Sequence, residues 1–280
     1  MRTIVHLSDL HFGRVDYAII EPIVECVHAL EPDLVVVSGD LTQRARGAEF
    51  RSARAFLDQL PQPQLVVTGN HDIPFYDVVS RFGAALTRYK QYITPELSPW
   101  FRDDEIAVAG VSTARSLAFK GGRINEQQVA WLHSKFAGLP VRMVKIIVTH
   151  HPFEIPVGHH EDDLLGRAEM AIRELADCDV DLFLSGHLHL GFTGNTAHRY
   201  RAEGQSSVIL QAGTATSTRG RGEPNSFNVI RVEHPSMVIE RMDWHAEEKR
   251  FSVATTEPFS EVDGVWERAT CASYGTLPLR

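Results

Sequence analysis

Side chains that can bind a metal ion follow five short apolar runs of this chain. The segments are Asp9-Leu10-His11, Gly39-Asp40, Gly69-Asn70-His71-Asp72, His150-His151 and Gly186-His187-Leu188-His189. They combine carboxylate oxygens, one amide oxygen and several imidazole nitrogens, a mixed set that suits first-row transition metals. Side chains alternate along an extended chain, so the outer two residues of the triplets 9–11 and 187–189 face one side. Each triplet can therefore offer two ligands from one stretch of backbone.

The apolar runs before these segments are expected to be β-strands that bring the polar ends together. In open α/β sheets, ligands bind at the carboxyl ends of the strands. Gly39, Gly69 and Gly186 come directly before presumed ligands, where a sharp turn or a close backbone approach is easiest for glycine. Each segment alone also fits an ordinary turn or a helix cap. Their appearance together, each after an apolar strand, favours one shared site.

The chain alternates strand-like and helix-like patterns over its first two thirds. We expect strands at 3–8, 33–38, 64–68, 105–111, 145–149 and 181–185, and helices at 17–30, 47–60, 125–139 and 163–176. The segment 74–104 is less regular. Further strand-like runs at 206–213, 226–233 and 236–244 have no helix between them. Two packed sheets with helices outside would accommodate both patterns.

We expect one main domain over residues 1–254 and a C-terminal extension over residues 255–280. The extension shows no clear periodicity. It could wrap around the domain, pair with another subunit or be loose, and its role stays open.

The composition excludes several classes of protein. The 280 residues are 43% hydrophobic and 23% charged, which is ordinary for a soluble globular protein. The formal net charge of −8 weighs against a broad grip on long nucleic acid. No apolar stretch reaches the ~18–20 residues of a membrane span, and a strand beginning at Thr3 leaves no room for a removable leader. Three distant cysteines, Cys26, Cys178 and Cys271, fit a reducing compartment. We therefore expect a soluble, cytoplasmic protein.

In order and spacing, the five segments resemble the signature of the calcineurin-like metallophosphoesterases. The segments extend from residue 9 to residue 189, about two thirds of the chain, and each ligand position carries the residue type of that family. The resemblance implies a four-layer α/β/β/α sandwich of two mixed β-sheets flanked by helices. It also implies a dinuclear metal centre. The last third of the chain resembles the family only in being β-rich.

Carried over position by position, the resemblance implies a full set of ligands for two metal ions. The first ion would be bound by Asp9, His11, Asp40 and His189, and the second by Asp40 as a bridge together with Asn70, His150 and His187. His150 is preferred over His151 because the family places its ligand directly at the strand end, and His151 could still touch substrate. Manganese, iron or zinc all suit such a site, and availability often decides between them.

The resemblance further implies that His71 faces the phosphate as a general acid or as a charge stabiliser. Asp72 could orient His71 or cap a helix that follows it, and we favour the cap. Two metal ions can clamp a phosphoryl group and hold a bridging hydroxide that attacks it.

Segments such as "SDLHFG", "VVSGDLT" and "THHP" are most similar to bacterial class III cyclic nucleotide phosphodiesterases, whose branch also contains glycerophosphodiester hydrolases. The function implied is hydrolysis of small phosphodiesters, with cyclic nucleotides as the favoured substrates. The alternatives are phosphomonoesters, other nucleotides or glycerophosphodiesters, and a non-catalytic scaffold that binds a partner. The oligomeric state stays open, with a homodimer among the options.

Three further segments could set specificity. The first is the loop 151–164 with His159 and His160, which could equally be a solvated surface loop. The second is an aromatic group that could stack a base or simply pack in the core: Phe75, Tyr76, Tyr89, Tyr92 and Trp100. The third is the glycine-rich stretch 218–225, whose Arg219 and Arg221 could hold phosphate or form an exposed basic turn.

Overall fold

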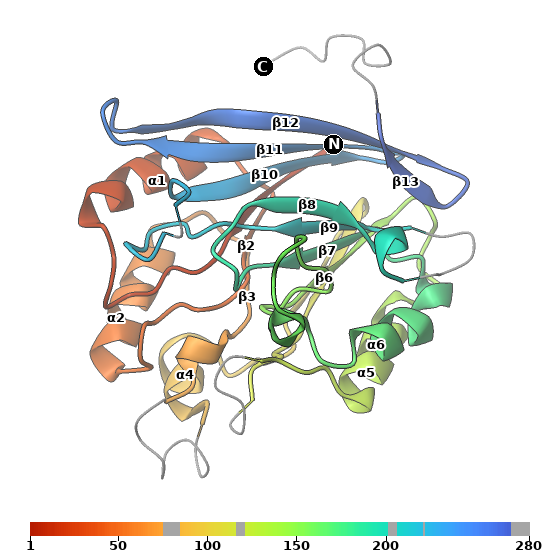
Figure 1. Ribbon diagram of the computed structural model, residues 1–280, viewed down its shortest axis with the longest axis horizontal. Helices are drawn as coiled ribbons and strands as arrows, with labels where there is room; N and C mark the ends of the chain where they lie inside the picture. Colours follow the sequence, from red (N-terminus) through yellow and green to blue (C-terminus); the bar gives the residue numbers. More distant parts are fainter. Residues whose placement is uncertain (75–84, 116–120, 201–205, 221, 270–280) are drawn as a thin grey trace.

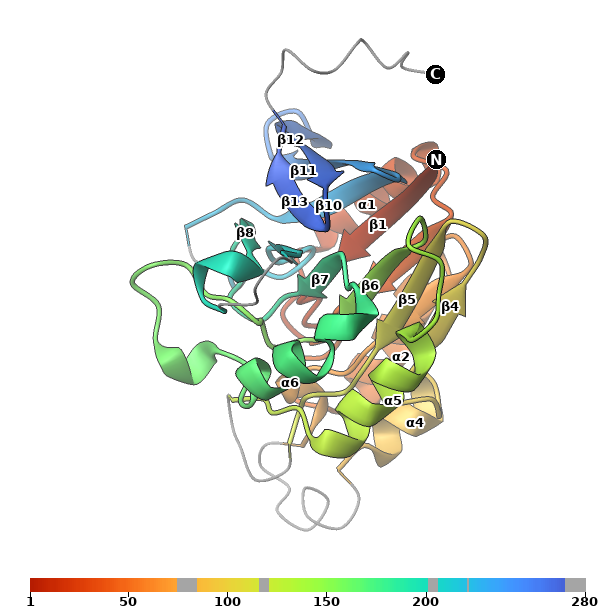
Figure 2. The ribbon, with the colours of Figure 1, turned by 90° about the vertical axis from the view of Figure 1, so that its right-hand side faces the viewer.

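Two β-sheets lie face to face in the computed structural model of the protein, with helices on the outer side of each sheet (Figure 1). The structure describes residues 1–74, 85–115, 121–200, 206–220 and 222–269. Figure 2, turned by a right angle, shows α5 and α6 outside the sheet that contains β5, β6 and β7, while α1 and α2 share a core with β1 and β2 of the other sheet. The predicted four-layer α/β/β/α architecture with two mixed sheets is thereby confirmed.

The first sheet contains the strands that precede three of the five polar segments. Its order is β13-β12-β11-β10-β1-β2-β3. The strands are β1 (Arg2–Leu7), β2 (Leu34–Val37), β3 (Gln64–Val66), β10 (Ser226–Glu233), β11 (Ser236–His245), β12 (Arg250–Val262) and β13 (Val265–Arg268). β1, β2 and β3 are parallel, so their carboxyl ends lie at one rim. The remaining strands form an antiparallel extension that begins where β10 pairs with β1.

The second sheet contains the strands that precede the other two polar segments. Its order is β4-β5-β6-β7-β9-β8. The strands are β4 (Trp100–Arg102), β5 (Ile106–Gly110), β6 (Val144–Val148), β7 (Leu182–Ser185), β8 (Phe192–Asn195) and β9 (Val208–Gln211). β5, β6, β7 and β9 are parallel, and β4 and β8 pair antiparallel at the two edges.

The helices cover the outer faces because each strand presents apolar side chains on both sides. The helices are α1 (Tyr17–Ala29), α2 (Gly47–Leu57), α4 (Thr87–Tyr92), α5 (Glu126–Phe136) and α6 (Ala168–Glu174). In β1, Val5 belongs to the core under α1 and α2, whereas Ile4 belongs to the core between the sheets. A third core packs α5 and α6 against the second sheet, for example Leu132 against Ile147. No helix in the described ranges is long and apolar enough to cross a membrane.

Helices α1, α2 and α5 lie within the ranges predicted for them. Asn125 begins α5 as expected, because its side-chain oxygen accepts the backbone N–H of Gln128, and its own backbone N–H donates to Gln128 Oε1. Pro22 lies in the second turn of α1 and does not prevent the helix. The predictions of helix position from apolar spacing are confirmed at these three places.

The helix predicted at 163–176 is shorter in the structure. α6 begins only at Ala168, and residues 161–163 form a separate 3-10 turn, η2 (Glu161–Asp163). Arg167 has a positive φ of 65°, a left-handed conformation that a continuous helix cannot contain. The bonds that Gly166 makes with Gly122 and Ile124 hold this break in place.

The domain boundary expected after residue 254 falls inside β12. This strand continues to Val262 and pairs with β11 along its length, and β13 then pairs with β12. Trp266 of β13 is 1% exposed, and its indole N–H donates to the Asp181 carboxylate at the start of β7, over 2.8 Å. Residues 255–268 are therefore part of the sandwich.

The bond between Trp266 and Asp181 is expected to stabilise the whole domain. Trp266→Phe removes the donor and leaves a buried carboxylate oxygen without it, which costs about 1–3 kcal/mol. Urea unfolding monitored by circular dichroism measures the loss of free energy of unfolding. The control is Trp131→Phe, whose ring lies partly buried on α5. Equal stability of the two variants would contradict an anchoring role for Trp266.

Candidate metal centre

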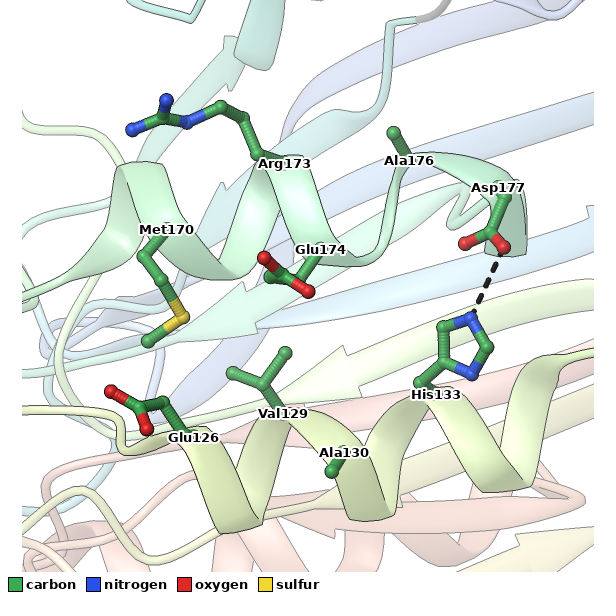
Figure 3. Close-up of a pocket in the computed structure, with 9 residues that line it drawn as sticks. All are labelled: Glu126, Val129, Ala130, His133, Met170, Arg173, Glu174, Ala176 and Asp177. Atoms are coloured by element: carbon green, nitrogen blue, oxygen red, sulfur yellow. Dashed lines mark hydrogen bonds and ion pairs between the residues drawn. The ribbon is translucent and has the colours of Figure 1, made fainter.

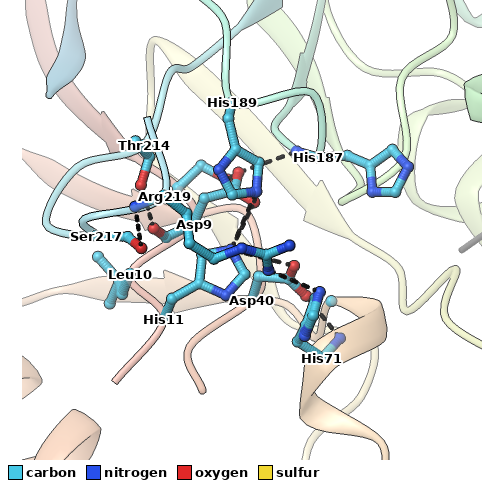
Figure 4. A network of polar contacts seen from close by, with 12 residues as sticks. Asp9, Leu10, His11, Asp40, His71, His187, His189, Thr214, Ser217 and Arg219 are labelled. Carbon is cyan, nitrogen blue, oxygen red and sulfur yellow. Dashed lines mark hydrogen bonds and ion pairs between the residues drawn. The ribbon is translucent and has the colours of Figure 1, made fainter. Parts of the chain in front are cut away.

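The five polar segments meet at the rim where the parallel strands of both sheets end. Asp9 and His11 follow β1, Asp40 follows β2, and Asn70 and His71 form the 3-10 turn η1 (Asn70–Asp72) after β3. From the second sheet, His150 and His151 follow β6, and His187 and His189 follow β7. Figure 4 shows several of these side chains gathered around Asp9 and Asp40. The convergence predicted from the strand ends is thus present in the structure.

A first group of ligand atoms consists of Asp9, His11, Asp40 and His189. The Nε2 atoms of His11 and His189 lie 3.1 Å apart. Asp9 Oδ1 lies 3.5 Å from His11 Nε2 and 3.3 Å from His189 Nε2. Two ligands bound at about 2.0–2.2 Å to one ion lie roughly 2.9–3.5 Å apart, so these atoms are spaced as ligands of one ion.

Asp40 faces two groups of ligands with its two carboxylate oxygens. Its Oδ2 lies 3.6 Å from His11 Nε2, and its Oδ1 lies 3.4 Å from His150 Nε2. His150 Nε2 is also 3.2 Å from the side-chain oxygen of Asn70. A carboxylate in this position can bridge two ions, as the resemblance implied.

The two neighbouring histidines after β6 have different surroundings. His150 Nδ1 donates to the carbonyl oxygen of Ser38 over 2.8 Å, so the neutral ring has its lone pair on Nε2, toward Asp40 and Asn70. His151 Nδ1 is instead 2.8 Å from the hydroxyl of Thr113. The geometry supports His150 as the ligand, although His151 also lies within reach of an ion shared with His150 and His187.

An unpaired atom in the first group indicates that a cation fits there. Asp9 is fully buried, and its Oδ2 accepts from the Ser8 hydroxyl and from the backbone N–H of His187. Its Oδ1 has no hydrogen-bond partner among the described residues and faces imidazole nitrogens. A buried carboxylate oxygen without a donor is costly. A bound cation would remove that cost, so the residues present fit a metal ion.

The backbone at the site takes conformations that are uncommon for residues with a side chain. Five of the seven expected ligands have a positive φ between 48° and 76°: Asp9, His11, Asp40, His187 and His189. Such strain collects at functional sites where the surroundings hold it in place. Gly186 permits the close packing, because a Cβ there would lie 1.8 Å from Ser8 Oγ. The loops of the two sheets therefore interlock at this rim.

The protonation states of Asp40, His187 and His189 favour cation binding. Burial opposes ionisation of Asp40, but nearby His150 and His71 outweigh it and hold the pKa of Asp40 well below its usual value. Burial lowers the pKa of His187 to about 3 and that of His189 to about 4, so both rings are neutral at pH 7. Burial also opposes charging of His150, yet Asp40 raises the pKa of His150 to about 9. An ion must therefore displace a proton from His150.

His71 lies beside the first group and is held by two polar neighbours. Its Nδ1 donates to the carbonyl oxygen of Gln43 over 2.8 Å, so the neutral ring has its lone pair on Nε2. Arg219 Nη1 lies 3.0 Å from that Nε2 (Figure 4). The exposed basic turn that we favoured for Arg219 is therefore wrong, because its side chain reaches the site. Arg221 lies outside the described residues.

Asp72 does not orient the ring of His71, because Gln43 occupies Nδ1. The Asp72 carboxylate accepts the backbone N–H groups of Leu41, Thr42 and Gly69. These bonds tie the turn after β3 to the loop after β2. The segment just beyond Asp72 that we expected to be helical includes residues 75–84, which lie outside the described residues.

Sequence reasoning missed several side chains that hold the ligand loops. Thr214 Oγ1 donates to the carbonyl oxygen of Asp9 over 2.7 Å, and Thr216 Oγ1 donates to that of Leu10 over 2.8 Å. Thr214 and Thr216 follow β9, and each lies more than 200 positions along the chain from the residue it contacts. No spacing in the sequence indicates such contacts.

The aromatic residues proposed to stack a base pack elsewhere in the structure. Tyr89 is 1% exposed and donates to the carbonyl oxygen of Val66, and Trp100 packs edge-on against Phe136. Tyr92 stacks on Phe50. Phe75 and Tyr76 lie outside the described residues. The described members of this group serve core packing, which is the interpretation that we favoured.

A separate cavity of about 840 Å³ lies between α5 and α6, away from the strand ends (Figure 3). Figure 3 shows His133 of α5 pairing across it with Asp177, over 3.1 Å. None of the expected ligands lines this cavity.

Comparison with known proteins finds a family model and several relatives that match this chain. The family model of the calcineurin-like phosphoesterases matches residues 2–191. The glycerophosphodiester phosphodiesterase GpdQ of Enterobacter lignolyticus is 27% identical over 207 residues, which cover 66% of this chain and 70% of that protein. A cAMP/cGMP dual specificity phosphodiesterase of Mycobacterium tuberculosis is 26% identical over 267 residues, which cover 84% of this chain and 77% of that protein.

A solved structure shares the fold. A dimetal phosphatase from Danio rerio superposes with a TM-score of 0.64 at 15% identity, and the match covers 91% of this chain and 98% of that one. The family model covers well over half of the chain and includes all five polar segments. The chain therefore belongs to the calcineurin-like phosphoesterase family and is a metal-dependent hydrolase of phosphoric esters.

Proposed function

We propose that the protein is a dinuclear phosphodiesterase that hydrolyses small phosphodiesters, with cyclic nucleotides as the favoured class. In this proposal the first ion is held by Asp9, His11, Asp40 and His189, and the second by Asp40, Asn70, His150 and His187. The observation that carries it is the position of Asp40, whose two oxygens face two separate sets of ligand atoms.

Bound in these positions, two cations supply Lewis-acid polarisation of the phosphoryl group and activation of the attacking water. The protein's own residues would position the ester and stabilise the leaving group. His71 presents Nε2 beside the first group, and the Arg219 guanidinium lies against it. A phosphate oxygen that enters between them would accept from Arg219 and free His71 Nε2 to face the leaving oxygen.

The proposed substrate class rests on the substrates of the two relatives. The two relatives compared above are phosphodiesterases for glycerophosphodiesters and for cyclic nucleotides, respectively. The cyclic nucleotide enzyme aligns over the larger share of this chain, which favours cyclic nucleotides. Glycerophosphodiesters are the second candidate for the same reason. Mixed oxygen and nitrogen ligands accept manganese, iron or zinc, so the proposal includes all three metals.

The proposal places the protein in the cytoplasm. Cys26 and Cys178 are free thiols, which fits a reducing compartment. We propose no particular oligomeric state.

A substrate screen tests the proposed function. Purified protein loaded with Mn²⁺, Fe²⁺ or Zn²⁺ is assayed on 3′,5′- and 2′,3′-cyclic nucleotides, glycerophosphodiesters, an aryl diester and phosphomonoesters. We expect the highest kcat/KM on a diester of biological origin. Much faster cleavage of a phosphomonoester than of any diester would contradict the proposal.

Removal of Asp40 is expected to empty the metal centre. Asp40→Ala takes away a carboxylate whose two oxygens face both groups of ligands, so both metal content and activity should fall sharply. Elemental analysis of the purified variant measures the metal, and Asp104→Ala, at an exposed position, serves as the control. Two metals retained per chain in Asp40→Ala would rule out the bridging role.

Replacement of His71 is expected to leave metal content unchanged and to slow hydrolysis. If His71 donates a proton, His71→Ala should slow esters with poor leaving groups by roughly 10²–10⁴-fold and aryl esters much less. Steady-state rates on an alkyl and an aryl diester distinguish these outcomes. An equal loss on both would show that His71 stabilises charge or position instead.

Arg219 is expected to contribute to substrate binding. Arg219→Ala should raise KM for a cyclic nucleotide about 10-fold or more, because a hydrogen bond to a charged group contributes about 1.5–3 kcal/mol. For bis-(p-nitrophenyl) phosphate we expect a smaller change, since this ester makes fewer outer contacts. Arg173→Ala, exposed on α6, is the control. If KM stays at the wild-type value for both esters, Arg219 does not contact substrate.

A further inference from the structure

The loop that follows His150 closes back on itself. It runs from His151 to Leu164, and the backbone N–H of Leu165 donates to the carbonyl oxygen of Pro152 over 2.8 Å. Near its end, η2 turns the chain once, and the N–H of Asp163 donates to the carbonyl oxygen of His160 over 2.9 Å. Such a compact loop has both ends close together. The end of this loop therefore lies near its start, next to the metal centre.

Arg199 holds the loop 151–164 through ion pairs with two of its glutamates. Its Nε donates to Glu154 Oε1 over 2.8 Å, and its Nη1 donates to Glu161 Oε2 over 3.0 Å. Glu154 is 6% exposed, so this charge-assisted bond is partly shielded from water. With two anchors on one arginine, the acidic turn at the end of the loop has a defined position.

Within that acidic turn, Asp163 points back toward the metal centre. Its Oδ1 lies 3.8 Å from His187 Nε2, and the two side chains are 24% and 8% exposed. Glu161 is paired with Arg199, and Asp162 is exposed to solvent. Among the three acidic residues of η2, Asp163 is therefore the one placed to act on a ligand.

His187 is positioned by a backbone hydrogen bond and by two neighbouring rings, and these contacts do not decide which of its ring nitrogens carries the proton. Its backbone N–H donates to Asp9 Oδ2, and its ring centroid lies 5.2 Å from that of His150 and 4.6 Å from that of His151. A neutral imidazole carries its proton on one nitrogen and its lone pair on the other, and a carboxylate beside one nitrogen selects which.

We propose that Asp163 is a positioning residue for the metal centre, which holds the proton of His187 on Nε2 so that Nδ1 offers its lone pair to the second ion. The inference rests on the metal assignment made under the proposed function. The gap of 3.8 Å exceeds a charge-assisted hydrogen bond by about 1 Å, and in the proposal the Asp163 side chain, which is 24% exposed, closes this gap when the ion is bound. The conformation of loop 151–164 is thereby linked to retention of one metal ion.

Metal affinity, measured independently of catalysis, tests the inference. Apo-protein is titrated with Zn²⁺ against a chromophoric chelator for the wild type, Asp163→Ala, Asp163→Asn and the control Asp162→Asn. We expect two ions per chain in every variant at saturation, with one site weakened about 10–100-fold in Asp163→Ala. Asp163→Asn should lie between, because its amide oxygen still accepts a hydrogen bond from His187 Nε2–H but carries no charge. Asp162→Asn should match the wild type.

Three results would overturn the role of Asp163. The first is equal affinity at both sites in Asp163→Ala and Asp162→Asn. The second is loss of one ion even at saturation, which would make Asp163 a ligand itself. The third is a loss of thermal stability in Asp163→Ala that is as large without zinc as with zinc, which would make the role of Asp163 merely structural.

Failure of the metal assignment gives a different result. His187→Ala is expected to lose one ion at saturation. If it retains both ions, the assignment of His187 fails together with the inference, whereas loss of an ion in His187→Ala with an unchanged Asp163→Ala rejects Asp163 alone.

Discussion

Two carboxylates buried beyond the reach of water dominate this structure. Asp9 and Asp40 are 0% and 1% exposed, and an uncompensated buried charge is among the most costly features a fold can contain. Backbone N–H groups of His187 and His71 each donate to one of them. Asp9 Oδ1 and Asp40 Oδ2 face imidazole nitrogens of His11 and His189, and a neutral imidazole brings no positive charge to them. Positive charge at this rim would make the arrangement favourable, and the two cations of the proposed function would supply it.

The same requirement explains the strained backbone around the site. Holding a non-glycine residue in the left-handed region costs about 1–2 kcal/mol, and five of the proposed ligands lie there. The cost is tolerated because the strands that precede these turns are locked into two sheets with apolar cores on both faces. Rigid strands thus stabilise turns that would not persist alone, and the turns aim the ligands inward.

Much of this could be predicted from the sequence, because the information is local. Apolar spacing located nine of the strands and three of the helices, and the residue types at the strand ends pointed to Asp9, Asp40 and the histidines that the structure brings together. β12 escaped prediction since most of its side chains are exposed or only partly buried, so apolar alternation is weak. The start of α6 was misplaced because the conformation of Arg167 depends on Gly122, far away in sequence.

Contacts between loops could not be predicted for the same reason. Arg219 meets His71 across 148 positions, and Thr214 meets Asp9 across 205. No periodicity links such residues, because their approach depends on how complete loops fold over the rim. Residues within the ligand motifs are readable from one segment, whereas residues that surround them require the assembled fold.

The residues of the candidate metal centre also connect the two sheets. His150 of the second sheet donates to the carbonyl oxygen of Ser38 in the first, and the loop after β7 gives its amide to Asp9 after β1. Neither sheet alone contains a complete set of ligands, so the site forms only when both sheets are packed. The ligands are consequently confined by the core, while Arg219 and Asp163 come from loops that the core constrains less. Under the two proposals, this division would allow the phosphoryl chemistry to stay constant on the fold while the loops at its mouth set substrate preference and metal retention.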